Sequence, residues 1–161
     1  MATYIGIDGG INGGITAIND NQNVIESIVM PVIDTPKGKV YDIIEIRDFI
    51  SKYENGFFVL EEAHTLPKNG AKQNFRTGEC FGIMKAIIEC EGRPFEIVRA
   101  KVWQKEIFQG QKVVDTKQAS ILYCRQKFPN IDWRASERCK KDHDGKTDSA
   151  CMSVYCFRIN K

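Results

Sequence analysis

Four carboxylates in three separated segments of the sequence have types and spacing that could bind metal ions. Asp8 ends one apolar run, and Glu61 follows a second at 57–60. Asp144 and Asp148 open a helical pattern near the C-terminus. Because these two aspartates are four residues apart, they would share one face of a helix. Like charges repel, so the four groups would converge only around bound cations.

Oxygen ligands of this kind suit Mg²⁺, with Mn²⁺ as a substitute. Two such ions about 4 Å apart could activate a water and stabilise the leaving oxygen in phosphodiester hydrolysis. Each carboxylate also has a simpler interpretation as a helix cap, a partner of a helix dipole or a solvated surface group. Their convergence in the fold is therefore what would make them a site.

The segment that follows Asp8 is rich in glycine. Four glycines in residues 9–14 separate the apolar runs 4–7 and 15–18, a pattern typical of a β-hairpin. Glycine allows left-handed φ values and leaves space beside the carboxylate, so a phosphate-bearing group could approach closely. An ordinary tight turn in which Asp8 is only a cap is the alternative.

The elements that would position these residues follow from apolar periodicity. We expect strands at 4–8, 15–18 and 24–30, a loop at 31–39, a helix at 41–53, a strand at 57–60, a polar loop at 64–74, a helix at 75–91, a strand at 94–99, and helices at 100–108, 117–128 and 144–159. A three-strand antiparallel meander followed by alternating strands and helices predicts an α/β fold with a mixed sheet and helices on both faces. The length predicts one domain, residues 1–161.

Composition narrows the function classes. The chain is 42% hydrophobic and 27% charged, and no apolar run reaches the roughly 20 residues that a membrane span requires. Residues 1–90 hold 8 Lys and Arg against 12 Asp and Glu, whereas residues 91–161 hold 15 against 9. An acidic centre within basic surroundings suits a metal-dependent enzyme that acts on a polyanion, although a solvated surface of mixed charge, the commoner case, would give similar totals. We see no secretory signal and expect an intracellular protein.

The six cysteines form no CxxC pair and do not cluster with the two histidines, which argues against a zinc site and a disulfide framework. Cys80, Cys90, Cys151 and Cys156 fall in apolar helical patterns, so we expect buried thiols there.

Five segments together resemble the RuvC family of Holliday junction resolvases, most of all its compact bacteriophage members. The segments are YIGIDGG at 4–10, VLEEAH at 59–64, GECFG at 78–82, VRAKVWQK at 98–105 and HDGKTDSA at 143–150. The resemblance implies an RNase H-like fold and a homodimer that makes paired, Mg²⁺-dependent nicks in four-way DNA junctions, with two ions per active site. It further implies 5′-phosphate and 3′-hydroxyl ends and the cytoplasm of a bacterial host.

Carried over by position, the family's metal-binding and catalytic carboxylates fall on Asp8, Glu61 and Asp148. The remaining ligand commonly lies three residues before the last aspartate, where this chain has Gly145. Asp144 is therefore our choice, and His143 its competitor. Glu62 likewise competes with Glu61.

The DNA contacts that we expect follow from charge and position beside the second carboxylate. Basic side chains suit phosphates, and His64 or Phe75 could stack on an unpaired base, although Phe75 is equally well placed to be core. The predicted DNA-binding residues are His64, Lys68, Lys72, Phe75, Arg76, Lys101, Lys105, Lys140, Lys141 and Lys146. Trp103 we interpret as core, and the small residues Gly78, Gly82 and Ala86 could lie against the sheet or a partner subunit.

Three competing functions remain. An actin-like or sugar-kinase-like nucleotide-binding protein would share the hairpin at 4–18, but it needs a second lobe for which 161 residues leave no room. A non-catalytic junction-binding module would not be expected to keep an uncompensated acidic cluster. Another RNase H-like nuclease would share the metal chemistry and differ in substrate.

Overall fold

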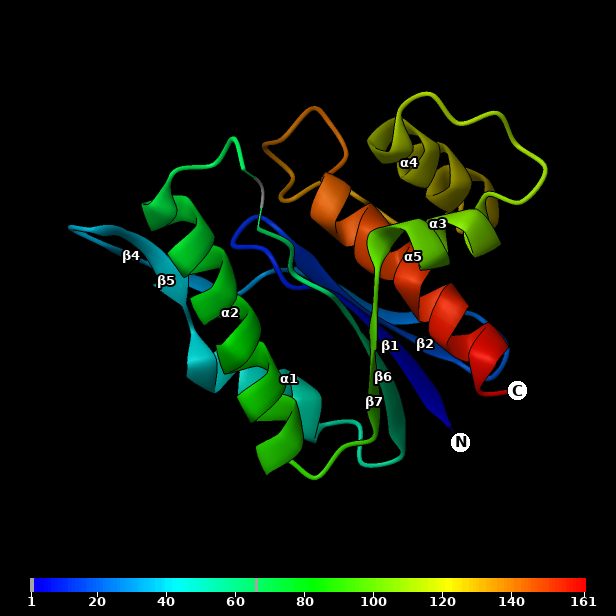
Figure 1. Ribbon diagram of the computed structural model, residues 1–161. Helices are drawn as coiled ribbons and strands as arrows, with labels where there is room; N and C mark the ends of the chain where they lie inside the picture. Colours follow the sequence, from blue (N-terminus) through cyan, green and yellow to red (C-terminus); the bar gives the residue numbers. More distant parts are fainter. Residues whose placement is uncertain (1, 66) are drawn as a thin grey trace.

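The structure is a computed structural model that describes residues 2–65 and 67–161. Its strands are β1 (Thr3–Asp8), β2 (Gly14–Asn19), β3 (Val24–Val29), β4 (Val32–Thr35), β5 (Gly38–Tyr41), β6 (Gly56–Glu61) and β7 (Phe95–Val98). Its helices are α1 (Ile43–Ser51), α2 (Ala71–Cys90), α3 (Ala100–Ile107), α4 (Thr116–Lys127) and α5 (Asp144–Ile159). Figure 1 shows helices on both sides of a central sheet.

The central sheet has the strand order β3-β2-β1-β6-β7. β1, β2 and β3 pair antiparallel, whereas β6 is parallel to β1 and β7 is parallel to β6. The predicted α/β fold, with its antiparallel meander and mixed sheet, is thus confirmed. Because β1 and β6 run in the same direction, their carboxyl ends meet at one edge, where Asp8 and Glu61 are placed.

Alternate side chains of the central strands enter two separate hydrophobic cores. Tyr4 and Val59 pack with α3, α4 and α5 on one face. Ile5 and Phe58 pack with α1 and α2 on the other. Both faces are therefore covered, which explains why β1 and β6 read as continuous apolar runs in the sequence.

Side-chain caps mark the starts of α1, α4 and α5. The Asp42 side chain accepts a hydrogen bond from the backbone N–H of Glu45, and Asp115 accepts from the first residues of α4. At α5 the cap is His143, whose ring nitrogen Nδ1 accepts from the backbone N–H of Lys146 at 3.3 Å. The predicted start of this last helix at Asp144 is confirmed.

Three local expectations are wrong. Residues 31–39 contain most of a two-stranded hairpin, β4–β5, because Gly38 adopts a φ of +111° at its turn. α2 begins at Ala71, inside the predicted polar loop, since a polar first turn carries no apolar periodicity. Cys90 is exposed because it lies two positions, about 200° around the helix, beyond the buried Ile88.

Cys80, Cys151 and Cys156 are buried, as predicted, and all six cysteines are free thiols. Within the described part of the chain, no helix combines the length and apolar character that crossing a membrane requires.

Candidate active site

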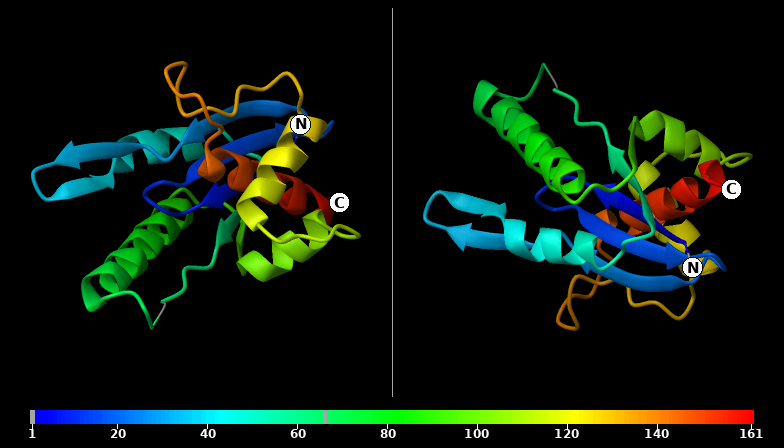
Figure 2. Two further views of the ribbon diagram at one scale, coloured as in Figure 1. Left: turned by 90° about the horizontal axis from the view of Figure 1, so that it is seen from above. Right: turned by 90° about the horizontal axis from the view of Figure 1, so that it is seen from below.

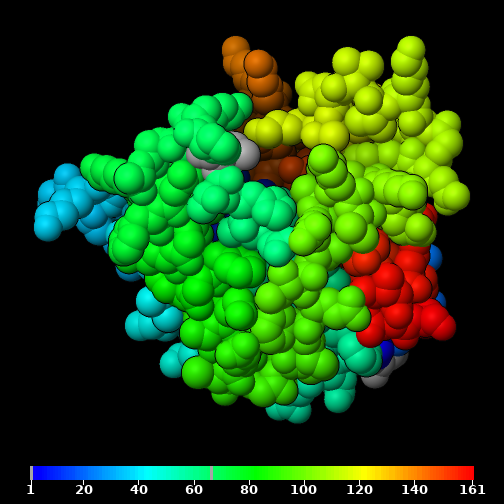
Figure 3. Space-filling view, viewed as in Figure 1, coloured from blue at the N-terminus to red at the C-terminus, as the bar shows by residue number. Residues whose placement is uncertain are grey.

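A cleft of about 840 Å³ lies at the carboxyl ends of β1 and β6 and the start of α5. Asp8, Glu61, Asp144 and Asp148 all line it, so the fold brings together the four predicted carboxylates from three distant segments. In the space-filling view, the orange atoms of the beginning of α5 lie between those of α4 and those of the segment after β6 (Figure 3).

Asp8 lies half-buried at the end of β1, and its Oδ1 accepts a hydrogen bond from the Gly10 N–H at 3.4 Å. The glycines that follow serve a different purpose from the one expected, since none in 9–14 has a positive φ. A Cβ on Gly13 would lie 2.0 Å from the Asp8 carbonyl oxygen, and one on Gly14 would lie 2.8 Å from that of Gly145. Both are required for close backbone packing. Tyr41 fixes the loop further by donating a hydrogen bond to the Gly9 carbonyl.

Glu61 is held by a buried tryptophan. The indole Nε1 of Trp103 donates to Glu61 Oε2 at 2.8 Å, and the Trp103 side chain is only 1% exposed. Trp103 is thus a core residue, as predicted, and also a hydrogen-bond donor to the cleft. Glu62 points to another partner, because its Oε2 lies 2.9 Å from Nε of Arg99. This geometry favours Glu61 over Glu62 as the carboxylate that faces Asp8.

The beginning of α5 separates Asp144 from His143. Asp144 lines the cleft and pairs with Lys117, whereas the His143 Nδ1 is engaged as the helix cap. A side chain at Gly145 has no room, since its Cβ would lie 2.4 Å from the backbone of Gly13. The position three residues before Asp148, where the sequence resemblance placed a ligand, therefore has no room for a side chain, and Asp144 is the neighbouring carboxylate that lines the cleft.

The carboxylates disturb one another electrostatically. Burial, followed by the charges of Glu61 and Asp148, raises the pKa of Asp8 to about 7. Burial raises the pKa of Asp148 to about 6, against a hydrogen bond from Ser120 that lowers it. Burial also raises the pKa of Glu61, opposed by the Trp103 hydrogen bond. At Asp144 burial is the largest single influence and acts upward, but the hydrogen bond and charge of Lys117, together with the smaller effects of His143 and the Gly145 N–H, outweigh it, and the pKa is lowered.

Crowded, half-buried carboxylates, three of them with raised pKa values, are a donor set that a divalent cation would relieve, so these residues fit a Mg²⁺ or Mn²⁺ site. In residues 2–65 and 67–161, no three His, Cys, Asp or Glu side chains are already arranged around one ion position. Two of the four are turned to other donors, since Glu61 accepts from Trp103 and Asp144 from Lys117.

Most of the predicted DNA-binding residues are on the surface, some at the cleft and the others outside it. His64 and Arg76 line the cleft, and Phe75 beside them on α2 is 74% exposed, which excludes the core interpretation of Phe75. The exposed lysines outside the cleft lining are Lys68 and Lys72 before and within the first turn of α2, Lys101 and Lys105 on α3, and Lys140 and Lys141 in the loop before α5.

Lys146 is the exception and its predicted DNA contact is wrong. The side chain is buried, and its ammonium group donates to the backbone carbonyls of Asp132 and Arg134 at 2.9 and 3.1 Å. A lysine that satisfies its charge this way anchors the loop before α5 and has no surface left for a phosphate.

Sequence reasoning missed Lys117 and Lys39, which also line the cleft. Lys117 lies in the first turn of α4, where a positive charge is unfavourable beside the helix dipole. That placement was the one feature of the sequence that could have indicated a role for Lys117 outside its own helix. Its ammonium group pairs with Asp144 across the cleft. Lys39 was assigned to a loop, so no signal placed it near Asp8.

The exposed stripe of Gly78, Gly82 and Ala86 does not lie against the sheet. Nothing lies within 4 Å of a Cβ placed on either glycine. This half of the expectation is wrong, and packing against a partner subunit stays a prediction.

No family model and no curated protein sequence matches the chain. Solved structures do. The RuvC of Thermus thermophilus in complex with a Holliday junction substrate aligns with a TM-score of 0.63 at 15% identity, over 99% of this chain and 96% of that one. A second structure of Thermus thermophilus RuvC aligns with a TM-score of 0.57 at 14% identity, over 98% and 96%. The chain therefore has the RNase H-like fold of RuvC along nearly its whole length.

Proposed function

We propose that this protein is a divalent-metal-dependent endonuclease that cuts branched DNA, four-way junctions above all. The observation that carries the proposal is the convergence of Asp8, Glu61, Asp144 and Asp148 in one cleft. The RuvC-like fold supports it, since a solved RuvC of that fold holds a Holliday junction. We also propose that residues 1–161 act as one nuclease domain.

Asp8, Glu61, Asp144 and Asp148 are the proposed ligands of Mg²⁺, or of Mn²⁺ in its place, with two ions per site. When bound, the metal would supply a polarised water and charge stabilisation at the scissile phosphate. The chain's own part is to hold the carboxylates in position. The Trp103 indole orients Glu61, and Lys117 orients Asp144 and places a positive charge beside the phosphate path.

Proposed DNA contacts surround the cleft. Arg76 and His64 are at its wall, and Lys68 and Lys72 extend the positive charge along the start of α2. Phe75, with 74% of its surface exposed, is available to stack on an unpaired base at a junction centre. Lys101, Lys105, Lys140 and Lys141 would serve the more distant arms.

Paired nicking needs two sites, so we propose a homodimer whose contact surface includes the exposed face of α2 at Gly78, Gly82 and Ala86. Water attack would leave 5′-phosphate and 3′-hydroxyl ends. Similarity to bacteriophage members of the family and a cytoplasmic location stay predictions from sequence.

The deciding experiment is cleavage of a synthetic four-way junction and a matched linear duplex, in Mg²⁺ or EDTA, by the wild type and Asp8→Asn. We expect symmetric, Mg²⁺-dependent nicks in the junction alone, which disappear in the variant while junction binding persists. Junctions that are bound but never cut in Mg²⁺ or Mn²⁺ would establish a non-catalytic binding module instead. Absence of both binding and cleavage would overturn the proposal and make nucleotide binding the next test.

A further inference from the structure

The β4–β5 hairpin supplies none of the four carboxylates of the cleft, so the proposed metal site does not explain its presence. Its strands pair in regular register, and the Thr35 hydroxyl donates to the Gly38 carbonyl across the turn at 2.5 Å. The two views of Figure 2 show the hairpin projecting from the body of the molecule on the same side as the start of α2. It is therefore a regular two-stranded arm with a hydrogen-bonded turn.

The end of this arm is basic and lies at the cleft. Lys37 and Lys39 are exposed, and Lys39 lines the cleft together with Asp8 and Arg76. A Cβ on Gly38 would lie 3.4 Å from Nη1 of Arg76, so the turn and the second turn of α2 are neighbours. Among the described residues, no salt bridge occupies either lysine or Arg76.

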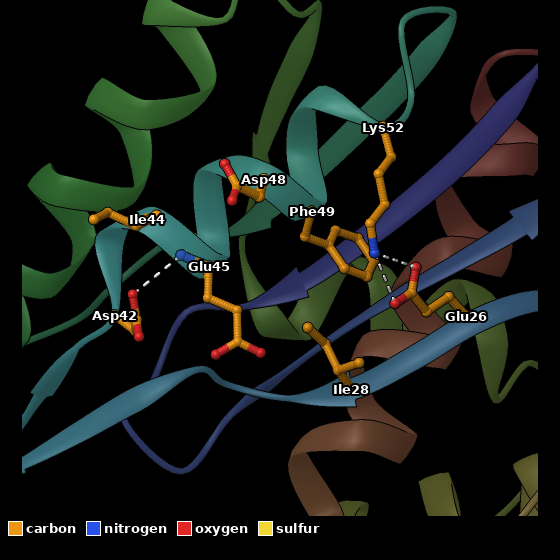
Figure 4. Close-up of a pocket in the computed structure, with 8 residues that line it drawn as sticks. All are labelled: Glu26, Ile28, Asp42, Ile44, Glu45, Asp48, Phe49 and Lys52. Atoms are coloured by element: carbon orange, nitrogen blue, oxygen red, sulfur yellow. Dashed lines mark hydrogen bonds and ion pairs between the residues drawn. The ribbon is translucent and has the colours of Figure 1, made fainter.

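Two acidic features restrict where a DNA strand could pass. Asp34 is the cross-strand neighbour of Lys39 within the hairpin. Beyond β5, a second hollow between α1 and β3 is lined by four carboxylates, Glu26, Asp42, Glu45 and Asp48 (Figure 4).

Most of these four carboxylates already have partners. Glu26 accepts from Lys52 at 3.1 Å, Asp42 caps α1, and Asp48 pairs with Arg47 at 2.6 Å. The hollow is therefore no strong site for a cation or a basic peptide. Its lining of four carboxylates against one lysine, Lys52, would still make it a less favourable path for an anionic strand than the Arg76 side of the hairpin.

We propose that the β4–β5 hairpin is a second DNA-binding arm, in which Lys37 and Lys39, together with Arg76, bind backbone phosphates of the duplex arm that leaves the cleft. The inference rests on the proposed function, because it assumes that DNA occupies the cleft. Contacts from flexible lysines to phosphates carry no base information, so the hairpin sets the register and angle of that arm and does not read sequence.

The test is the salt dependence of four-way junction binding by the full-length protein, in EDTA to prevent cleavage. For Lys37→Ala/Lys39→Ala we expect about tenfold weaker binding and a log–log salt slope reduced by about 1 to 2, since each lost phosphate contact lowers the slope by about 0.9. Lys37→Arg/Lys39→Arg keeps both charges and should retain the wild-type slope.

Lys161→Ala is the matched control, because Lys161 lies beyond the far end of α5, about 24 Å along that helix from Asp144. It should change neither affinity nor slope. Wild-type binding with an unchanged slope in the double alanine variant would overturn the hairpin proposal and leave the proposed function standing. Failure of the wild type to bind junctions at all would overturn both. Unfolding curves establish that each variant is folded.

Discussion

The two helices that cover opposite faces of the sheet, α5 and α2, are packed in contrasting ways. Residues 145–156 of α5 are buried with the single exception of Asp148, which faces the cleft. α2 buries only one side, and Gly78 and Gly82 on its other side have open space around them. The helix that supplies two carboxylates is thus held on all sides, whereas the helix beside the proposed DNA path keeps a free face.

Glycines have opposite roles at these two helices, on the strand beneath α5 and on α2 itself. Gly6 on β1 lets α5 approach so closely that a Cβ there would lie 2.1 Å from the Ser149 carbonyl oxygen. The Thr16 and Ser149 hydroxyls, 2.8 Å apart, satisfy each other in the same interface. On α2 the glycines make no such contact. The same residue type therefore allows close packing of the helix that supplies two cleft carboxylates and leaves an accessible surface on the other helix.

The largest effect is expected for Gly6→Ala. Its Cβ would meet backbone atoms of Ser149 and Ser153 at 2.1 and 2.4 Å, which no side-chain rotation can relieve. We expect a loss of more than about 4 kcal/mol in the free energy of unfolding, a large part of the about 5 to 15 kcal/mol that stabilises a typical domain. Urea denaturation measures it, with Gly82→Ala as the control in open space. A stably folded Gly6→Ala protein would contradict the close packing of α5.

Next in size is the effect of Asp8→Asn on the metal-free protein. The folded pKa of Asp8, about 7, exceeds the ordinary value of 3.8, so the folded state binds more protons between these values. The relative stability that protonation provides is present below the ordinary value and is lost as pH rises through 7. Asp8→Asn should therefore raise the free energy of unfolding near pH 8 by up to about 4 kcal/mol and little near pH 4.

Thermal or urea denaturation in EDTA at both pH values measures this difference. Asp34→Asn, which changes an exposed hairpin carboxylate outside the cleft, is the control and should have little effect at either pH. Equal stability of Asp8→Asn and wild type near pH 8 would mean that the carboxylates do not repel one another as the cleft implies.

A smaller effect is expected from Trp103→Phe. This variant tests whether Trp103 of α3, which packs on the same face of the sheet as α5, orients Glu61. The change removes the indole donor 2.8 Å from Glu61 Oε2 and keeps a buried ring. We expect the Mg²⁺ concentration for half-maximal cleavage to rise about 10- to 100-fold, with junction affinity in EDTA unchanged.

Trp133→Phe is the matched control for this variant. Trp133 is also buried, but its Nε1 has no hydrogen-bond partner among the described residues. The comparison separates loss of a hydrogen bond from loss of indole volume. The same rise in Mg²⁺ requirement in both variants would refute a positioning role for Trp103.

The smallest effect is expected for Gly78→Ala on α2. An alanine there fits the open space and favours the helix, so the unfolding free energy of the monomer should increase by about 0.5 to 1 kcal/mol. If this face packs closely against a second copy, the same variant should weaken dimerisation. Unfolding and sedimentation at two protein concentrations distinguish these effects, and lower stability at both would contradict an open face.

Much of the fold was accessible from the sequence because its signals are local. Apolar runs of strand length ended at Asp8 and Glu61, and the start of α5 coincided with Asp144. The polar first turn of α2 and the β4–β5 hairpin were missed, because neither shows a regular spacing of apolar residues from which it could be predicted. The burial of Lys146 was missed as well, since a lysine shows its carbonyl partners only in the folded chain.

The sequence by itself therefore determined which carboxylates end their elements and which layers those elements form. Only the tertiary structure decided how the carboxylates are held, with Trp103 donating a hydrogen bond to Glu61 and Lys117 pairing with Asp144. It also decided that a side chain has no room at Gly145. The physical reason is range. Periodicity and capping act over a few neighbouring residues, whereas each of these contacts joins segments far apart in the chain and exists only once both faces of the sheet are packed.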